Sequence, residues 1–261
     1  MFKKLKIDSQ NQINQLTKEV RASYYLHRDL YNTKSEYTHN SEKLVTIKPS
    51  PKINVEPFWE DSQLEIEDKQ LQQILDLEGR LMAQYIEQNP NFGVKVRESV
   101  YLKLKEVANN LPNNYMLIIK IGFRPVSVQY QLFNEVFAYF KTVNPHFDDN
   151  PIKAMTLEFV THPDSNIPPH STGAAIDMTL FDSDKNDYID MGSAINYPDN
   201  RSWTFNFDNL SQEQIDNRML LTDIMLEAGF ANLASEWWHF SYGDPRWAVF
   251  YDTKSMYGLS E

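Results

Sequence analysis

Residues 170–181 read HSTGAAIDMTLF, and this stretch predicts both a strand and part of a functional site. The apolar run Ala174–Phe181 is typical of a buried strand. Gly173, just before it, permits a tight turn into that strand. His170 and Asp177 lie seven residues apart across the turn, so one histidine and one carboxylate belong to the same turn-and-strand segment.

A second segment, Glu236-Trp237-Trp238-His239, places another carboxylate and another histidine three residues apart in a predicted aromatic strand, Trp237–Tyr242. On a regular strand, residues three apart face opposite sides of the sheet. Glu236 and His239 can therefore converge only if the strand is bulged or if it ends between them.

Together the two segments favour a catalytic zinc site. Such a site uses three nitrogen or oxygen ligands and one open position, and a nearby carboxylate that is not a ligand accepts the proton of the attacking water. Two histidines and two carboxylates supply one acidic group more than the metal itself needs, and that group can serve as the base. Taken singly, each pair has a simpler explanation, as a surface or capping pair or as a hydrogen-bonded histidine in an aromatic core.

A fixed cation is predicted at Arg124. It follows the short apolar run Tyr115–Ile121, which fits a buried strand, and it stands between Phe123 and the rigid Pro125. This position suits a cation that stabilises the oxyanion of a tetrahedral intermediate. The alternative is an arginine that closes the strand with a surface ion pair.

The remaining pattern predicts an α+β chain. Apolar residues at helical spacing indicate helices near residues 71–86, 100–111 and 132–140. Ser211-Gln212-Glu213-Gln214 resembles a capping box that opens a further helix, which we expect to end at Gly229. The stretch 182–186 begins like a calcium-binding loop, but Asp187 replaces the required glycine, so we expect a polar hairpin turn there.

Residues 1–60 differ in texture from the rest. A helix is plausible up to about residue 32, and residues 32–60 are polar and interrupted by three prolines, which is typical of a linker or an extended crossing segment. We therefore expect an N-terminal extension of unknown role at residues 1–60 and a domain at residues 61–261 that carries the site.

Composition narrows the partners and the location. A net charge of −11 and the lack of any Lys/Arg cluster argue against nucleic acid. The chain has no cysteine, so any metal must be held by His, Asp or Glu. No apolar run is long enough to span a bilayer. We expect a cytoplasmic protein, or a periplasmic one if a leader has been removed, and the sequence carries no signal for its oligomeric state.

Five motifs in order resemble the D-alanyl-D-alanine dipeptidase family of zinc peptidases, over roughly residues 92–247. The motifs are GFRP at 122–125, HSTGAAIDMTL at 170–180, MGSAIN at 191–196, NRMLL at 217–221 and EWWHFSYGD at 236–244. The resemblance implies a compact α+β domain built on an antiparallel sheet with packed helices. It also implies that His170, Asp177 and His239 bind one zinc ion, Glu236 is the general base, and Arg124 steadies the transition state.

Three positions depart from the family pattern: Ile121 where an acidic residue is common, Pro168 where dipeptidases often have serine, and Asn196. Asn196 falls where the family offers an Asp to the free amino group of the substrate. An asparagine accepts a hydrogen bond from an ammonium group without opposing its charge. Selection for a free amino terminus should therefore weaken.

The resulting hypothesis is a zinc metallopeptidase for short D,D-peptides, with D-Ala-D-Ala as the first substrate. One alternative is a D,D- or L,D-carboxypeptidase that trims longer peptidoglycan peptides, as Asn196 suggests. Another is a catalytically silent zinc-binding interaction protein, which the unmatched residues 1–60 suggest.

Overall fold

β5 (Ala175–Asp182), which grows out of the segment HSTGAAIDMTLF, is a central strand of a six-stranded sheet. The strand order is β2-β4-β5-β8-β7, and β6 pairs with the far end of β5. The other strands are β2 (Ile53–Val55), β4 (Tyr115–Ile121), β6 (Asp187–Tyr188), β7 (Ala231–Leu233) and β8 (Glu236–Ser241). All pairings are antiparallel except that of β2 with β4 at one edge. The predicted α+β class with an antiparallel sheet is confirmed, and the parallel edge is the one correction.

The computed structural model describes residues 42–57, 69–89, 93–197, 200–208 and 210–260. The helix predicted before residue 32 lies outside these ranges. Within them, no helix combines the length and the apolar character needed to cross a membrane.

Residues 42–57, which fall in the predicted extension, contribute strands to the sheets. β1 (Leu44–Thr46) pairs antiparallel with β3 (Lys95–Arg97) in a separate two-stranded sheet. β2 adds to the edge of the main sheet beside β4. The division of the chain at residue 60 stays a prediction, but this described part of the extension is built into the fold.

One face of the sheet packs on α4 (Glu98–Asn110) and α7 (Gln212–Glu227). Ile119 of β4 and Met178 of β5 are opposite each other in the ladder, and both are buried in this core. Because successive side chains of a strand point to opposite faces, Asp177 points to the other face. The site face of the sheet is therefore the one away from α4 and α7.

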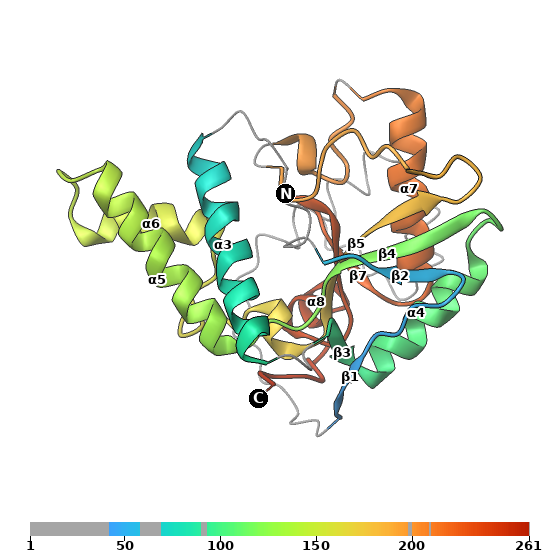
Figure 1. Cartoon of the computed structure of the whole chain (residues 1–261), viewed down its shortest axis with the longest axis horizontal. Coiled ribbons are helices and arrows are strands. Elements are labelled where there is room, and N and C mark those ends of the chain that lie inside the picture. The colour runs from blue at the N-terminus through green and yellow to red at the C-terminus, as the bar shows by residue number, and fades with distance from the viewer. Residues whose placement is uncertain (1–41, 58–68, 90–92, 198–199, 209, 261) are drawn as a thin grey trace.

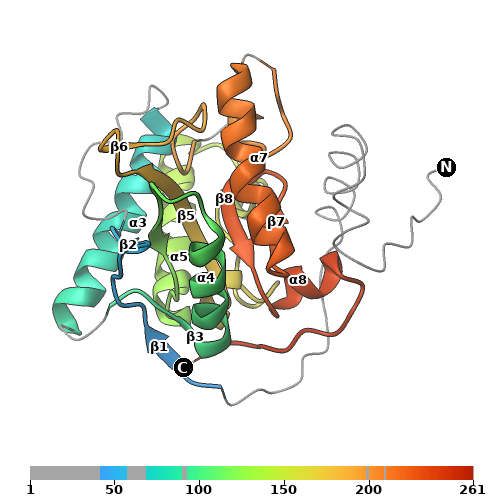
Figure 2. The same ribbon diagram turned by 90° about the vertical axis from the view of Figure 1, so that its right-hand side faces the viewer.

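A second apolar cluster joins α3 (Lys69–Gln88), α5 (Val126–Val143) and α6 (Asp149–Phe159). These helices lie on the other side of the strands from α4 and α7 (Figures 1 and 2). A third cluster packs α7, β7 and the short α8 (Pro245–Phe250) together. The sheet is thus held between two helical layers.

The predicted start and end of α7 are confirmed. The backbone N–H of Gln214 donates to the Ser211 hydroxyl at 3.2 Å, and the Ser211 N–H donates to the Gln214 side chain at 2.8 Å, which completes a capping box. The chain then leaves the helix at Gly229, whose φ is 87°, a left-handed value that glycine adopts without strain. The polar turn between β5 and β6 is confirmed as well, with Asp182 paired to Asp187.

Candidate metal centre

Asp177 and His239 come from neighbouring strands and face each other directly. Asp177 of β5 is opposite His239 of β8 in the antiparallel ladder, so both side chains project from the same face. His239 Nδ1 lies 2.9 Å from Asp177 Oδ1, and both residues are buried. The sheet register therefore creates half of the site.

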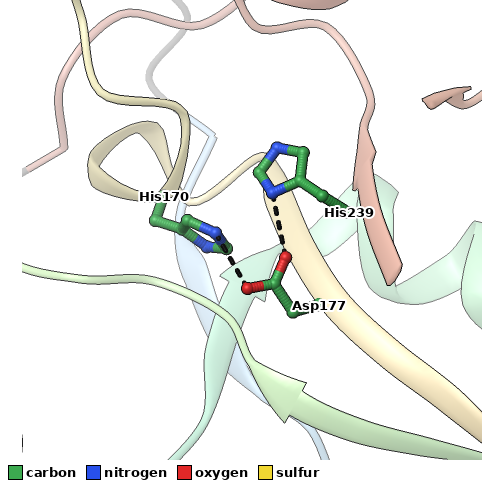
Figure 3. A group of neighbouring side chains, drawn as sticks. All are labelled: His170, Asp177 and His239. Carbon is green, nitrogen blue, oxygen red and sulfur yellow. Dashed lines mark hydrogen bonds and ion pairs between the residues drawn. The ribbon is translucent and has the colours of Figure 1, made fainter. Parts of the chain in front are cut away.

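His170 reaches the same carboxylate from a loop. It lies in a 3-10 turn, Pro169–Thr172, which Gly173 ends with a φ of 73° and so redirects the chain into β5. His170 Nε2 lies 3.4 Å from Asp177 Oδ2 (Figure 3). The expected tight turn at Gly173 is present, and it folds His170 back over the strand that follows it.

The ring of His170 is oriented by a backbone carbonyl. Its Nδ1 lies 2.9 Å from the carbonyl oxygen of Gly122. Because a carbonyl can only accept, Nδ1 must carry the proton, and in the neutral ring Nε2 then offers its lone pair toward Asp177. A carbonyl in this role fixes the tautomer of metal-binding histidines.

Glu236 joins the cluster because β8 is irregular. Asn232 of β7 is opposite Phe240, whereas the next residue, Leu233, is opposite Glu236, so three residues of β8 have no partner in β7. This bulge brings Glu236 Oε2 to 3.8 Å from His239 Nδ1. The condition stated from the sequence, a bulged strand, is met.

Arg124 lies next to His170 and is nearly inaccessible to water. Its backbone N–H donates to the His170 carbonyl at 3.1 Å, and its guanidinium donates to the Gln129 side chain at 2.9 Å. Burial lowers the pKa of Arg124 to about 10, although the negative charges of Asp177 and Glu236 oppose this effect. The group therefore remains a cation at neutral pH.

The electrostatics of the three central residues follow from burial and from their mutual contacts. Burial lowers the pKa of His170 below its ordinary value, against the raising effect of Asp177. Burial would raise the pKa of Asp177, but the charges and hydrogen bonds that the two histidines provide when protonated lower it. For His239, the hydrogen bond and charge of Asp177 outweigh burial, so its pKa is raised. Asp177 is thus kept ionised and His170 neutral, the forms that bind a metal, whereas the raised pKa of His239 favours a protonated form whose proton a metal must displace.

The residues present fit a divalent metal ion. His170, Asp177 and His239 each offer one ligand atom, and these atoms lie within 4.8 Å of one another. His239 Nε2 is buried and has no hydrogen-bond partner among the residues that the structure describes. Two imidazole nitrogens and one carboxylate form a donor set typical of catalytic zinc.

Asn196 is not part of this cluster. It lies in the loop after β6 with a left-handed φ of 61°, and within the described ranges no hydrogen bond or ion pair joins it to the three central residues. Its loop is nevertheless tied to the site strand, because Trp237 Nε1 donates to the Ser193 hydroxyl at 2.9 Å. Asp190 and Asp199 are the two acidic residues nearby in the sequence that could supply the charge Asn196 lacks. Asp190 accepts from the Gln214 side chain at 2.8 Å, and Asp199 lies outside the described residues.

Sequence reasoning missed two residues that orient the site. The Gly122 carbonyl holds His170, and Gln129 holds Arg124 while its own amide donates to the Thr161 carbonyl at 2.9 Å. Gln129 lies near the start of α5, five residues after the arginine. Gln129 could have been identified as an orienting residue from its burial near the start of a helix, but only once that helix was known to begin at residue 126.

Fold and site together define an α+β protein with a buried His–Asp–His centre, flanked by a carboxylate and a buried arginine. The family model described as D-ala-D-ala dipeptidase matches residues 90–256. The chain therefore belongs to the D-Ala-D-Ala dipeptidase family, which confirms the resemblance found in its motifs.

Relatives named D-alanyl-D-alanine dipeptidase match parts of the chain. One from Synechocystis is 32% identical over 162 residues, which cover 54% of this chain and 65% of the relative. One from Escherichia coli is 41% identical over 71 residues, or 27% of this chain and 36% of the relative. The chain thus spans less than two thirds of the length of either relative. A solved structure of a mutant vancomycin resistance D,D-pentapeptidase VanY in complex with Zn(II) is similar at 15% identity and a TM-score of 0.36, covering 62% of this chain and 82% of that one.

Proposed function

We propose that this chain is a zinc-dependent peptidase that hydrolyses short D,D-peptides, with D-Ala-D-Ala as the first substrate to test. The observation that carries the proposal is the convergence of His170, Asp177 and His239, with Glu236 Oε2 3.8 Å from His239 Nδ1. Membership of the D-Ala-D-Ala dipeptidase family supports the choice of substrate.

In this proposal His170, Asp177 and His239 hold the ion, and Glu236 is left as the base. A bound zinc ion supplies Lewis acidity, which lowers the pKa of water and polarises a carbonyl group. Glu236 is half-buried and lies at the edge of the cluster, where its carboxylate can meet solvent and substrate. It accepts the proton of the attacking water and returns it to the leaving amine.

Arg124 stabilises the negative charge that develops on the substrate oxygen. Its guanidinium is buried and is held by Gln129, so little reorganisation is needed when the charge appears. The negative charges of Asp177 and Glu236 favour its charged form against the effect of burial. A fixed cation beside the base suits the tetrahedral intermediate of amide hydrolysis.

The test is Glu236→Gln in the zinc-loaded protein. The amide keeps the size of the side chain but cannot accept the proton, so kcat on D-Ala-D-Ala should fall by about 10²–10⁴-fold while the zinc content stays at one ion per chain. Glu106→Gln, an exposed change on α4, should leave both unchanged. Wild-type hydrolysis by zinc-loaded Glu236→Gln would rule out this mechanism.

A second candidate, a D,D- or L,D-carboxypeptidase on longer peptidoglycan peptides, is favoured by Asn196. An asparagine there gives no charge to hold a free substrate amino group. Hydrolysis of D-Ala-D-Ala and of an N-acylated tripeptide should be compared in the wild type and in Asn196→Asp. A wild-type preference for the blocked peptide, shifted toward the free dipeptide by Asn196→Asp, would select the carboxypeptidase.

A further inference from the structure

The bulge of β8 contains carbonyl groups that one buried side chain collects. Asn232 is 1% exposed, and its Nδ2 donates to the backbone carbonyl of Glu236 at 3.2 Å and to that of His239 at 3.0 Å. These two carbonyls lie at the two ends of the segment that has no partner in β7. A side-chain amide thus holds the two backbone carbonyls that flank the interruption of the β7–β8 ladder.

The acceptor end of the same amide is fixed too. The Thr204 hydroxyl donates to Asn232 Oδ1 at 2.7 Å, and Thr204 is fully buried. Its backbone N–H donates to the Ala234 carbonyl at 2.9 Å, in the turn between β7 and β8. Because the amide oxygen accepts from Thr204, Nδ2 must point toward the bulge, so the orientation of Asn232 is determined by its surroundings.

We propose that Asn232, held by Thr204, is a positioning residue that keeps Glu236 beside His239. His239 is also fixed by its place opposite Asp177 in the β5 ladder, which Asn232 does not touch. Glu236 lies beyond the last β5–β8 pair, Asp177 with His239, and its ladder partner is Leu233 of β7, the residue next to Asn232. Loss of the Asn232 amide should therefore displace the base more than the metal ligands.

The inference rests on the proposed role of Glu236 as the base. A direct measurement of the position of Glu236 tests the role of Asn232 separately from that proposed function. Crystal structures of the zinc-loaded wild type and of Asn232→Leu should show the Glu236 carboxylate displaced by about 1 Å or more, a shift that can cost about 100-fold in rate. The three ligand side chains should superpose. An unmoved Glu236 would overturn the inference whether or not the protein hydrolyses D,D-peptides.

Kinetics supply the second readout. Asn232→Leu and Asn232→Asp, which both lose the two donated hydrogen bonds, should lower kcat about 10–100-fold, the usual effect of an outer partner of a metal site. The zinc Kd should change less than about threefold. Equal losses of kcat and zinc affinity would indicate a merely structural role and overturn the inference.

Two variants of Thr204 and one matched control complete the test. Thr204→Val should lower kcat in the same direction, and Thr204→Ser, which keeps the hydroxyl, should restore it. Thr222→Val is the control, since Thr222 is equally buried and its hydroxyl has no hydrogen-bond partner within the described ranges. In a Glu236→Gln background, Asn232→Leu should cost no further activity, because the residue it positions is already inactive. A full additional loss there would contradict the proposal.

Discussion

The backbone N–H of Arg124 donates to the carbonyl oxygen of His170 at 3.1 Å. A backbone hydrogen bond therefore joins the residue that carries the buried cation to the first histidine of the cluster. The preceding Gly122 carbonyl also contacts the His170 ring. A single short segment after β4 thus orients the imidazole and aims the guanidinium. The backbone bond fixes the main chain of Arg124 beside His170, and Gln129 holds the guanidinium.

Arg124→Ala should therefore lower kcat far more than it raises KM. Removing a preorganised oxyanion donor costs about 10²–10³-fold in kcat, and the backbone hydrogen bond to His170 survives the change. Arg124→Lys should recover only part of the loss, because an ammonium group cannot reproduce the planar geometry that Gln129 holds. Steady-state kinetics on a D,D-dipeptide measure both. A KM effect larger than the kcat effect would show that Arg124 binds the ground state instead.

Asp177→Asn should abolish high-affinity zinc binding with little change in shape. Replacing a residue that only hydrogen-bonds a metal ligand already lowers metal affinity about 10–100-fold. Removing the charge of a ligand itself should therefore lower zinc affinity more than about 100-fold. At a zinc concentration 100 times the wild-type Kd, the wild type should gain about 2.7 kcal/mol of stability, and the variant much less.

Denaturation with and without zinc measures this difference, and a chelator should remove it. Asp187→Asn, in the exposed β6, is the matched control and should bind zinc normally. Stabilisation of Asp177→Asn equal to that of the wild type would exclude Asp177 as a ligand.

The residues of the candidate site could be predicted because they lie close together in the sequence. The residues that orient them could not be predicted in this way. Gly173 and the apolar run after it place His170 and Asp177 on one turn and strand, and this is visible in twelve letters of sequence. That Glu236 meets His239 depends on the pairing of β8 with both β5 and β7. The register of a sheet depends on two strand segments together. The spacing of Glu236 and His239 therefore predicted that a bulge was needed, but it did not show which pairing forms the bulge.

The same limit explains the elements that were not predicted. α6 has Pro151 in its first turn, where the missing N–H is not needed, although a proline more often marks a break. β2 lies among prolines that indicated a linker, but an edge strand tolerates them. In both cases tertiary packing decides between two outcomes that the local sequence allows.

Stability should fall at alkaline pH through Tyr257. Burial, together with its hydrogen bond to Glu42, raises the pKa of Tyr257 to about 12, against an ordinary value of 10.0. A raised pKa favours the neutral form in the folded state, so this contribution is complete below pH 10 and is lost as the pH rises toward 12.

The free energy of unfolding from denaturant titrations between pH 9 and 12 should decline less steeply in Tyr257→Phe than in the wild type. Subtracting the phenolate absorbance titration of Tyr257→Phe from that of the wild type gives the titration of Tyr257 alone. A Tyr257 that ionises at its ordinary pKa would contradict the expectation.

Gly122→Ala should destabilise the fold and loosen the metal centre together. A Cβ at this position would lie 2.4 Å from the backbone oxygen of Lys95 and 2.9 Å from Val94, so the segment that holds His170 must shift. Overpacking of this kind costs about 1–3 kcal/mol, and displacement of the Gly122 carbonyl should weaken zinc binding about 10–100-fold.

Gly79→Ala is the matched control for that variant. Gly79 lies within α3 and a Cβ there meets nothing within 4 Å, so alanine should stabilise the helix by about 0.5–1 kcal/mol and leave zinc affinity unchanged. Urea denaturation and zinc titration of both variants give the comparison. The extra methyl group of Gly122→Ala forces the backbone to shift. If the variant lost stability but bound zinc as tightly as the wild type, the imidazole of His170 would have stayed in place despite that shift. The hydrogen bond from His170 to Gly122 would then not be what orients the ligand.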